Sequence, residues 1–379
     1  MHCIARSPRE GRTHRAQALI NRMNSLYTET GNKMLKPDKI SYTSLMKAIM
    51  MDKEPGFVTK CKSILNEMWE EYAKGNERLK PDVFAYGTVL NAMSDGALPE
   101  ESEALLDEME KLAMTGEKEF YPSIICYNTV MNAYAKRRRH DAAKQTERIF
   151  NRINEARRKG NSDLEPNDVS YSIYIMALAK SDDLDKVQKA ESIFNKWRDQ
   201  YSSKTRSFSP TSVWSSLLFL YAESKLEDKV EKMLSMIKQM EECNQIDTIS
   251  YNILLKGCSK SNRDSPEQRK RILEISQVAF KALNDGKRLR ADAYSYTTLL
   301  HICDKFIDDP SEKQATIKAF FRRCCEDGEV NESLFRTFKR VSSHDTYLEA
   351  TKIGENMVVN SYDDLPMEWK YRHDKSKKK

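Results

Sequence analysis

The segment Ile125-Cys-Tyr-Asn-Thr-Val-Met-Asn-Ala-Tyr-Ala-Lys136 decides how this chain folds, because it recurs. The segment Ile249-Ser-Tyr-Asn-Ile-Leu-Leu-Lys-Gly-Cys-Ser-Lys260 has the same order of an aliphatic residue, a small residue, Tyr-Asn, an apolar run and a closing Lys. Five looser copies begin at Ile40, Phe84, Val169, Val213 and Tyr294. A repeat this short cannot bury its own apolar face, so its recurrence predicts a stacked array.

A second pattern alternates with the first. Apolar residues follow the spacing i, i+3, i+4, i+7, which marks one face of an amphipathic helix, as in Thr146/Ile149/Phe150/Ile153. Prolines at 37, 81, 122, 166 and 210 separate the repeats, and a proline disfavours helix at the residue before it. Each repeat is therefore predicted to consist of a first helix with the Tyr motif and a second helix with the stripe.

Composition narrows the class of protein. The chain has 379 residues, few Gly (12) and Pro (11), and 32% charged residues, a mixture that favours helices. The formal net charge is +6, but residues 370–379 hold six basic residues and one acidic residue, so the rest of the chain is nearly neutral. Binding of a polyanion would therefore depend on local clusters of charge.

Signatures of an enzyme are missing from the sequence. The eight cysteines form no CxxC pair, and with six scattered His no zinc-binding spacing arises. The H-x-E with P-C-x-x-C pattern of zinc deaminases, a Gly-rich phosphate loop and G-x-S-x-G are absent. We therefore expect no enzymatic activity, no metal and no cofactor. Cys61, Cys126, Cys258 and Cys303 are interpreted as buried thiols.

The two alternating helix signatures and the Pro-Asp punctuation resemble pentatricopeptide repeats over roughly residues 11–340. Most repeats here are longer than those of that family, whose unit is about 35 residues. The resemblance implies an all-α, right-handed superhelical α-solenoid that binds single-stranded RNA and reads one base per repeat. It also implies a mitochondrial or plastid location and a role in RNA processing, stability, editing or translation. A protein-binding helical scaffold within an organellar ribonucleoprotein is the alternative.

In this family two side chains read each base, and we name their places the first and second reading positions. The first follows the motif Tyr, at Thr43, Gly87, Asn128, Ser172, Ser215, Asn252 and Thr297. The second ends the repeat, at Asp82, Ser123, Asn167, Thr211, Asp247, Asp292 and Asn331. Short amide, hydroxyl and carboxylate groups can bond a base edge, although such residues also cap helices. By resemblance the site reads 5′-G-x-Y-x-G-U-A-3′, with Asn128/Asn167 at the third base and Asn252/Asp292 at the sixth.

Other positions of the repeat have two interpretations each. The residue two before the motif Tyr is either base-flanking or core, at Ile40, Phe84, Ile125, Val169, Val213, Ile249 and Tyr294. The motif Tyr itself is interpreted as core. Lysines eight residues after the first reading position, Lys136, Lys180, Lys260 and Lys305, either contact RNA phosphates or complement the end of their own helix.

Three segments are expected along the chain. Residues 1–38 form an N-terminal partial repeat, residues 39–343 an array of about seven repeats, and residues 344–379 a degenerate C-terminal segment with a basic tail. Arg6, Arg9, Arg12 and Arg15 suggest a transit peptide, but their overlap with a helical stripe favours a truncated or mis-started repeat. The scaffold alternative implies partner proteins in a ribonucleoprotein; a membrane partner or a small-molecule substrate is not expected.

Overall fold

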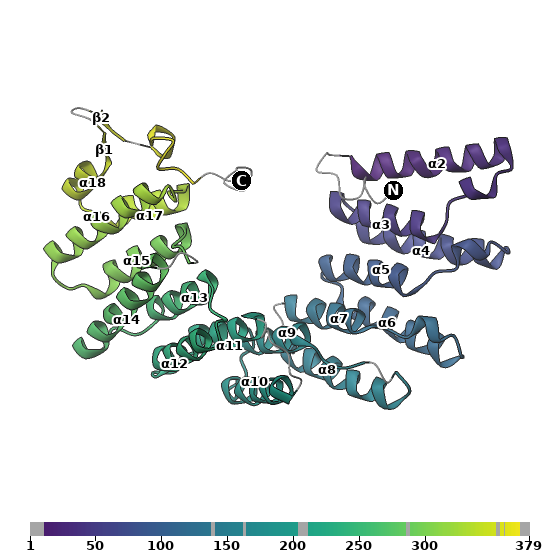
Figure 1. Cartoon of the computed structure of the whole chain (residues 1–379), viewed down its shortest axis with the longest axis horizontal. Coiled ribbons are helices and arrows are strands. Elements are labelled where there is room, and N and C mark those ends of the chain that lie inside the picture. Colours follow the sequence, from purple (N-terminus) through teal and green to yellow (C-terminus); the bar gives the residue numbers. More distant parts are fainter. Residues whose placement is uncertain are drawn as a thin grey trace. The chain divides into compact units, whose positions relative to one another are not determined.

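The computed structural model describes residues 11–137, 141–161, 164–203, 211–285, 289–353, 357–359 and 361–371. These residues form pairs of antiparallel helices, and they divide into two compact units, Met1–Asp183 and Leu184–Lys379. The expectation of an all-α helical-repeat solenoid is confirmed (Figure 1).

The first compact unit holds the first helices α3 (Lys39–Asp52), α5 (Val83–Asp95), α7 (Ile124–Lys136) and α9 (Asp168–Ala179). Its second helices are α2 (Arg12–Thr30), α4 (Phe57–Ala73), α6 (Pro99–Met114) and α8 (Ala142–Arg158). Short 3-10 helices η1 (Lys33–Leu35), η2 (Glu77–Leu79) and η3 (Lys118–Phe120) lie in the connectors. First helices pack on one another in series; each second helix packs on the next first helix, and α4, α6 and α8 also pack on their own.

The second compact unit repeats this order. Its first helices are α11 (Thr211–Glu223), α13 (Thr248–Ser259), α15 (Ala293–Phe306) and α17 (Glu332–Val341). Its second helices are α10 (Lys186–Ser203), α12 (Lys229–Glu242), α14 (Pro266–Asp285), α16 (Pro310–Asp327) and the short α18 (His344–Thr351). The pair α17 and α18 is an additional, shorter helix pair, and the rings of Phe335 and Phe338 lie against Tyr347.

The C-terminal segment is hydrogen-bonded to the chain just before α17. Two-residue strands β1 (Lys352–Ile353) and β2 (Met357–Val358) pair antiparallel, and the 3-10 helix η4 (Tyr362–Asp364) follows. The backbone of Val330 then bonds residues on either side of Lys370, donating to the Trp369 carbonyl at 2.9 Å and accepting from the Tyr371 N–H at 2.8 Å. Most of the expected basic tail, from residue 372 on, lies outside the described residues, as do Arg6 and Arg9.

The motif tyrosines form the core, as expected. Tyr86, Tyr127 and Tyr296 are fully buried, and Tyr42, Tyr171 and Tyr251 are buried almost as far. The hydroxyls of Tyr86 and Tyr127 donate to Glu108 and Glu110 of α6, each at 2.6 Å. Burial and these carboxylates raise the pKa of both phenols above the ordinary value. The four cysteines expected inside the repeats are buried as well.

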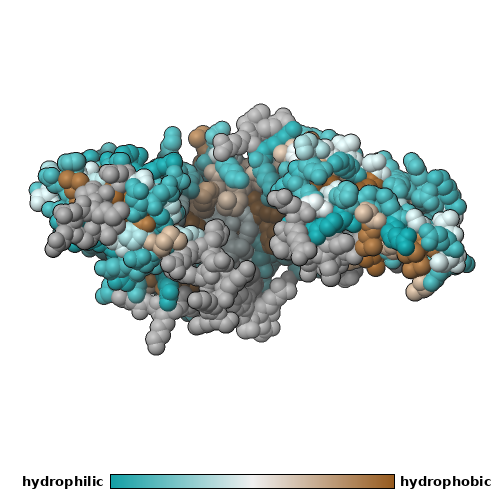
Figure 2. Space-filling view, turned by 90° about the horizontal axis from the view of Figure 1, so that it is seen from above, coloured by the Kyte–Doolittle hydropathy of each residue, from teal (hydrophilic) through white to brown (hydrophobic). Residues whose placement is uncertain are grey.

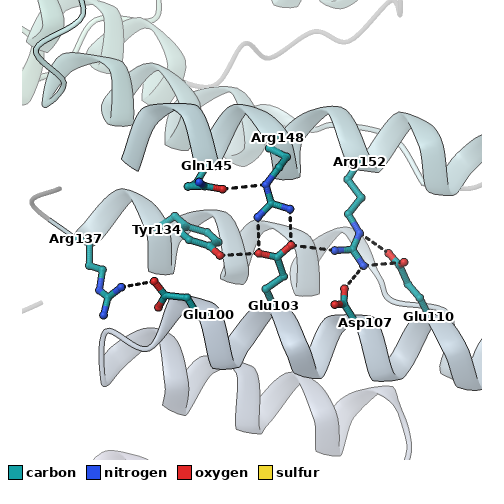
Figure 3. A network of polar contacts seen from close by, with 9 residues as sticks. All are labelled: Glu100, Glu103, Asp107, Glu110, Tyr134, Arg137, Gln145, Arg148 and Arg152. Atoms are coloured by element: carbon teal, nitrogen blue, oxygen red, sulfur yellow. Dashed lines mark hydrogen bonds and ion pairs between the residues drawn. The ribbon is translucent and has the colours of Figure 1, made fainter. Parts of the chain in front are cut away.

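A charged network joins the second helices α6 and α8 across α7 (Figure 3). Glu103 accepts from Arg148 through both carboxylate oxygens, at 2.6 and 2.5 Å, and from the Tyr134 hydroxyl at 2.6 Å. Arg152, whose side chain is 18% exposed, bonds Asp107 at 2.5 Å and Glu110 at 2.8 Å. Because paired guanidinium and carboxylate groups hold both helices at a set distance, the network stabilises the spacing of these two repeats.

Candidate nucleic-acid interface

Helix capping places the second reading positions. Asp82, Asn167, Asp247, Asp292 and Asn331 are each the N-cap of a first helix, with a side-chain oxygen that accepts from a backbone N–H two or three residues on. Such a cap satisfies a donor that the helix leaves free. The capping interpretation is therefore correct for these residues, and it also fixes where their oxygens lie. Ser123 is the N-cap of α7, but its side chain makes no cap bond.

Two of the predicted reading pairs are brought together across neighbouring repeats. In the first compact unit, the Asn128 Nδ2 donates to the Oδ1 of Asn167 at 3.0 Å. In the second, the Asn252 Nδ2 lies 3.1 Å from both carboxylate oxygens of Asp292. The partners are 39 and 40 residues apart in sequence. Each pair thus forms one hydrogen-bonding group between the cap of one first helix and the helix before it.

The threonines at the first reading position make different contacts. Thr43 donates its hydroxyl to the carbonyl of Lys39, and Thr297 to that of Ala293, each at 2.7 Å within its own helix. Asp82, which is predicted to act together with Thr43, forms an ion pair with the Lys39 ammonium at 3.0 Å. Each of these threonine hydroxyls has already donated its one hydrogen, so its oxygen can only accept a further hydrogen bond.

The remaining first reading positions have small side chains. Gly87 offers none, and a Cβ built there would meet nothing within 4 Å, so the place is open. The hydroxyls of Ser172 and Ser215 are buried and have no hydrogen-bond partner among the described residues. Ser172 belongs to the first compact unit and its predicted partner Thr211 to the second.

The repeat that begins at α11 requires a correction. Val213 was expected to flank a base, but its side chain is fully buried, and the exposed residue at the corresponding place is Ser212. The Ser216 hydroxyl donates to the Ser212 carbonyl just as Thr88 donates to that of Phe84, which sets the alignment. Trp214 thus occupies the place of the motif Tyr, and Ser215 keeps its position.

The same alignment corrects Thr211. It is the first residue of α11 rather than the cap before it, so it corresponds to Val83 of α5 and not to Asp82. The position that matches the other second reading positions is residue 210, which lies outside the described residues. The shift arises because a one-residue displacement leaves the apolar pattern of a short helix almost unchanged.

Six of the seven predicted base-flanking residues are exposed apolar side chains. Ile40, Phe84, Ile125, Val169, Ile249 and Tyr294 have exposed fractions between 49% and 72%. The core interpretation is therefore wrong for these six. Apolar residues reach a surface that is otherwise largely hydrophilic (Figure 2). Exposed apolar residues that are scattered singly over a surface are ordinary, but here they recur at the same position of six repeats. This regular placement indicates a binding surface.

The four lysines contact the preceding first helix. Lys136 bonds Asp95 at 3.1 Å, Lys180 the Ala135 carbonyl at 3.4 Å, and Lys260 bonds Glu223 at 2.6 Å. Lys305 donates to the carbonyls of Ser259 at 3.0 Å and Ser261 at 2.7 Å. Each lysine thus bonds the neighbouring repeat, and Lys136 and Lys305 also lie in the last turn of their own helices, where the helix-end interpretation places them. Contact with phosphates stays a prediction, which the spare N–H donors of each ammonium allow.

Sequence reasoning missed two serines and one arginine. Ser170 and Ser295, the third residues of α9 and α15, donate to the Oδ1 of Asn128 at 2.7 Å and of Asn252 at 2.5 Å. A serine three residues after an Asp or Asn cap is a capping-box signal, but it does not reveal the contact with the helix before. Arg336 of α17 occupies the first reading position of its helix, as Thr297 does in α15, since each lies five residues after its helix cap.

Among the described residues no cluster of three or more His, Cys, Asp or Glu side chains could hold a metal ion. No helix in the described part of the chain is long and apolar enough to cross a membrane.

Paired helices stacked in series define a helical-repeat protein; six of the first helices carry an exposed apolar residue at the same place, and two polar pairs join successive first helices. Within that class, residues 125–146, which span α7 and the start of α8, match the family model described as PPR repeat. This segment of the chain is thus similar to a pentatricopeptide repeat. No protein of curated description matches the sequence.

Solved structures also match. The crystal structure of the pentatricopeptide repeat protein PPR10 from maize aligns with 17% sequence identity and a TM-score of 0.37, over 89% of this chain and 52% of the maize chain. This chain therefore spans about half the length of the maize protein.

Proposed function

We propose that this protein binds single-stranded RNA in a sequence-selective way, with the paired reading positions facing the bases and the exposed apolar residues against the base faces. The observation that carries the proposal is the direct pairing of Asn128 with Asn167 and of Asn252 with Asp292. Pentatricopeptide repeats are modules that read one RNA base each with two or three side chains. Here two such side chains form one hydrogen-bonding group in both places.

The neighbouring apolar residues support the same proposal. Ile125 and Ile249 lie on the first turn of the helices that carry Asn128 and Asn252, and both are more than half exposed. Apolar side chains pack against the face of any base, so Ile125 and Ile249 would add affinity without choosing among the bases. Selection among bases then rests on the paired polar groups. We propose a role in organellar RNA processing, stability, editing or translation.

Selection of bound RNAs from a random pool tests the proposal. The full chain should enrich RNAs that contain the order G-x-Y-x-G-U-A, and fluorescence anisotropy should show weaker binding to the matching duplex DNA. The double variant Asn128→Ala with Asn252→Ala is the control, and it should lose enrichment at the third and sixth bases only. A pool that stays random after selection, with capture of partner proteins instead, would favour the protein-binding scaffold.

The organellar location is tested separately. We expect the tagged full-length protein to copurify with mitochondria or plastids and to crosslink there to organellar transcripts. Crosslinks found only to nuclear-encoded transcripts outside these organelles would contradict that part of the proposal.

A further inference from the structure

We infer that Ser170 and Ser295 are positioning residues for base selection: each holds the reading asparagine of the preceding repeat so that its amide offers a hydrogen-bond donor, and not an acceptor, to the base. The inference rests on the proposed reading of RNA by Asn128 and Asn252 and assigns a further residue to each of these two sites.

The atoms around Asn128 form a closed set of hydrogen bonds. The backbone N–H of Asn167 donates to the Ser170 Oγ at 3.1 Å, and the Ser170 hydroxyl lies 2.7 Å from the Oδ1 of Asn128. The Asn128 Nδ2 donates to the Oδ1 of Asn167, which also accepts from the Ser170 backbone N–H at 3.2 Å. Ser170 is fully buried.

The direction of these bonds follows from elementary chemistry. A backbone N–H only donates, so the oxygen of Ser170 accepts from Asn167 and its one hydrogen is free for an acceptor. The closest acceptor is the Oδ1 of Asn128, since that of Asn167 is farther away, at 3.2 Å. The amide of Asn128 is thereby held with its oxygen turned toward Ser170. One of its two amide hydrogens goes to Asn167, and the other remains to donate to a base.

Asn252 is held in the same way but more firmly. Ser295 donates to its Oδ1 at 2.5 Å, and its Nδ2 faces the carboxylate of Asp292. A carboxylate accepts hydrogen bonds only, so it keeps the amide nitrogen turned toward it even without Ser295. Asn167, which faces Asn128, is a neutral amide and constrains less. Loss of the serine should therefore matter more for Asn128 than for Asn252.

The chain contains matched controls. Ser41 and Ser250 are also the third residues of first helices, and both bond the Asp that caps the helix, at 2.9 and 2.6 Å. The reading residue before Ser250 is Ser215, whose hydroxyl has no partner among the described residues. Ser41 follows α2, which carries no reading motif. Alanine at either position removes a capping bond without touching a reading amide.

The experiment measures the dissociation constants of the full chain for four synthetic single-stranded RNAs that differ only at the third base of the G-x-Y-x-G-U-A core. A second set varies the sixth base. With its donor fixed, Asn128 should favour uracil, which offers carbonyl oxygens, over adenine, which offers an amino group. In Ser170→Ala the amide can turn over, so the preference for uracil over adenine at the third base should fall about two- to tenfold.

Three further measurements complete the test. Ser295→Ala should reduce the same preference at the sixth base by a smaller factor, and Ser41→Ala and Ser250→Ala should leave both preferences unchanged. All four variants should lose similar thermal stability, because each loses a cap bond. In a chain that already carries Asn128→Ala, adding Ser170→Ala should have no effect on base preference.

The outcomes separate the inference from the proposed function. If the parent ranks the bases and Ser170→Ala ranks them identically, Ser170 only caps α9 and the inference is wrong. If Ser250→Ala shifts the preferences as much as Ser170→Ala, the effect arises from weakened helices, which also overturns it. If the parent binds RNA but ranks all four bases alike at the third position, the reading role of Asn128 itself is refuted.

Discussion

Asn252→Thr is the most informative single change at the reading positions. Asn252 has an exposed fraction of only 7%, and its amide nitrogen faces both oxygens of Asp292. Threonines at the same position in α3 and α15 donate to the carbonyl four residues before, at 2.7 Å. The replacing threonine should therefore donate to the carbonyl of Thr248 and leave the carboxylate of Asp292 without the amide donor.

A carboxylate without that donor can accept from guanine, which offers an N–H and an amino group on one edge, whereas uracil offers one N–H between two carbonyl oxygens. Thr with Asp also favours G by family resemblance. Each mismatched base costs about 1–3 kcal/mol, by analogy with duplex readout. Losing a preference for U and gaining one for G should thus change the ratio of the two affinities by about 2–6 kcal/mol, or roughly 30-fold to 10⁴-fold.

The assay is fluorescence anisotropy with two RNAs that differ only in U or G at the sixth base. Asn24→Thr is the matched control, because Asn24 is an exposed residue of α2 away from any reading position. It should leave both affinities unchanged. If parent and Asn252→Thr rank U and G alike, Asn252 is not a reader and the assignment of bases to repeats is wrong.

Five other perturbations have defined outcomes. Phe84→Ser should weaken RNA binding by about 1–3 kcal/mol without lowering stability, since its ring is exposed, whereas Val213→Ser should lower the urea midpoint because that side chain is buried. Changing Lys136, Lys180, Lys260 and Lys305 to Gln should flatten the slope of the logarithm of the RNA-binding constant against log[salt] by about 2.8, at about 0.7 per phosphate contact. An unchanged slope would mean that these lysines contact only neighbouring helices and not RNA phosphates. Gly87→Ala should raise the free energy of unfolding by about 0.5–1 kcal/mol, because its helical site has room for a Cβ; a lower urea midpoint would contradict this. Burial raises the pKa of Glu103, but the bonds from Arg148 and Tyr134 outweigh burial and hold this pKa below the ordinary value. The free energy that Glu103 contributes to folding should therefore be lost as the pH falls below about 4. Glu103→Gln should make the urea midpoint less dependent on pH in that range.

Much of the architecture was predictable because its causes are local. The alternation of two helix signatures predicts the helix pairs, since apolar spacing decides which face of a helix is buried. An Asp or Asn before the first turn predicts where α5, α9, α13 and α15 begin, since such residues cap helices. The burial of the motif Tyr follows from its position on the same face as the apolar residue three places on.

Other features depend on how repeats meet. The place of Val213 could not be settled from the apolar run alone, because a shift of one residue exchanges a buried for an exposed position while the run still reads as a helix. The contacts of Lys136 also depend on a neighbouring repeat, since its ammonium bonds Asp95 and the Ser94 carbonyl at the end of α5.

The sequence by itself determined the helices, their order and the residue types available at the reading positions. Only the tertiary structure decided which of those residues touch: Asn128 with Asn167 and Ser170, and Asn252 with Asp292 and Ser295. The physical reason is distance along the chain. A hydrogen bond acts over about 3 Å, whereas these partners are 39 to 43 residues apart, so their contact depends on how one first helix packs on the next and not on any local preference.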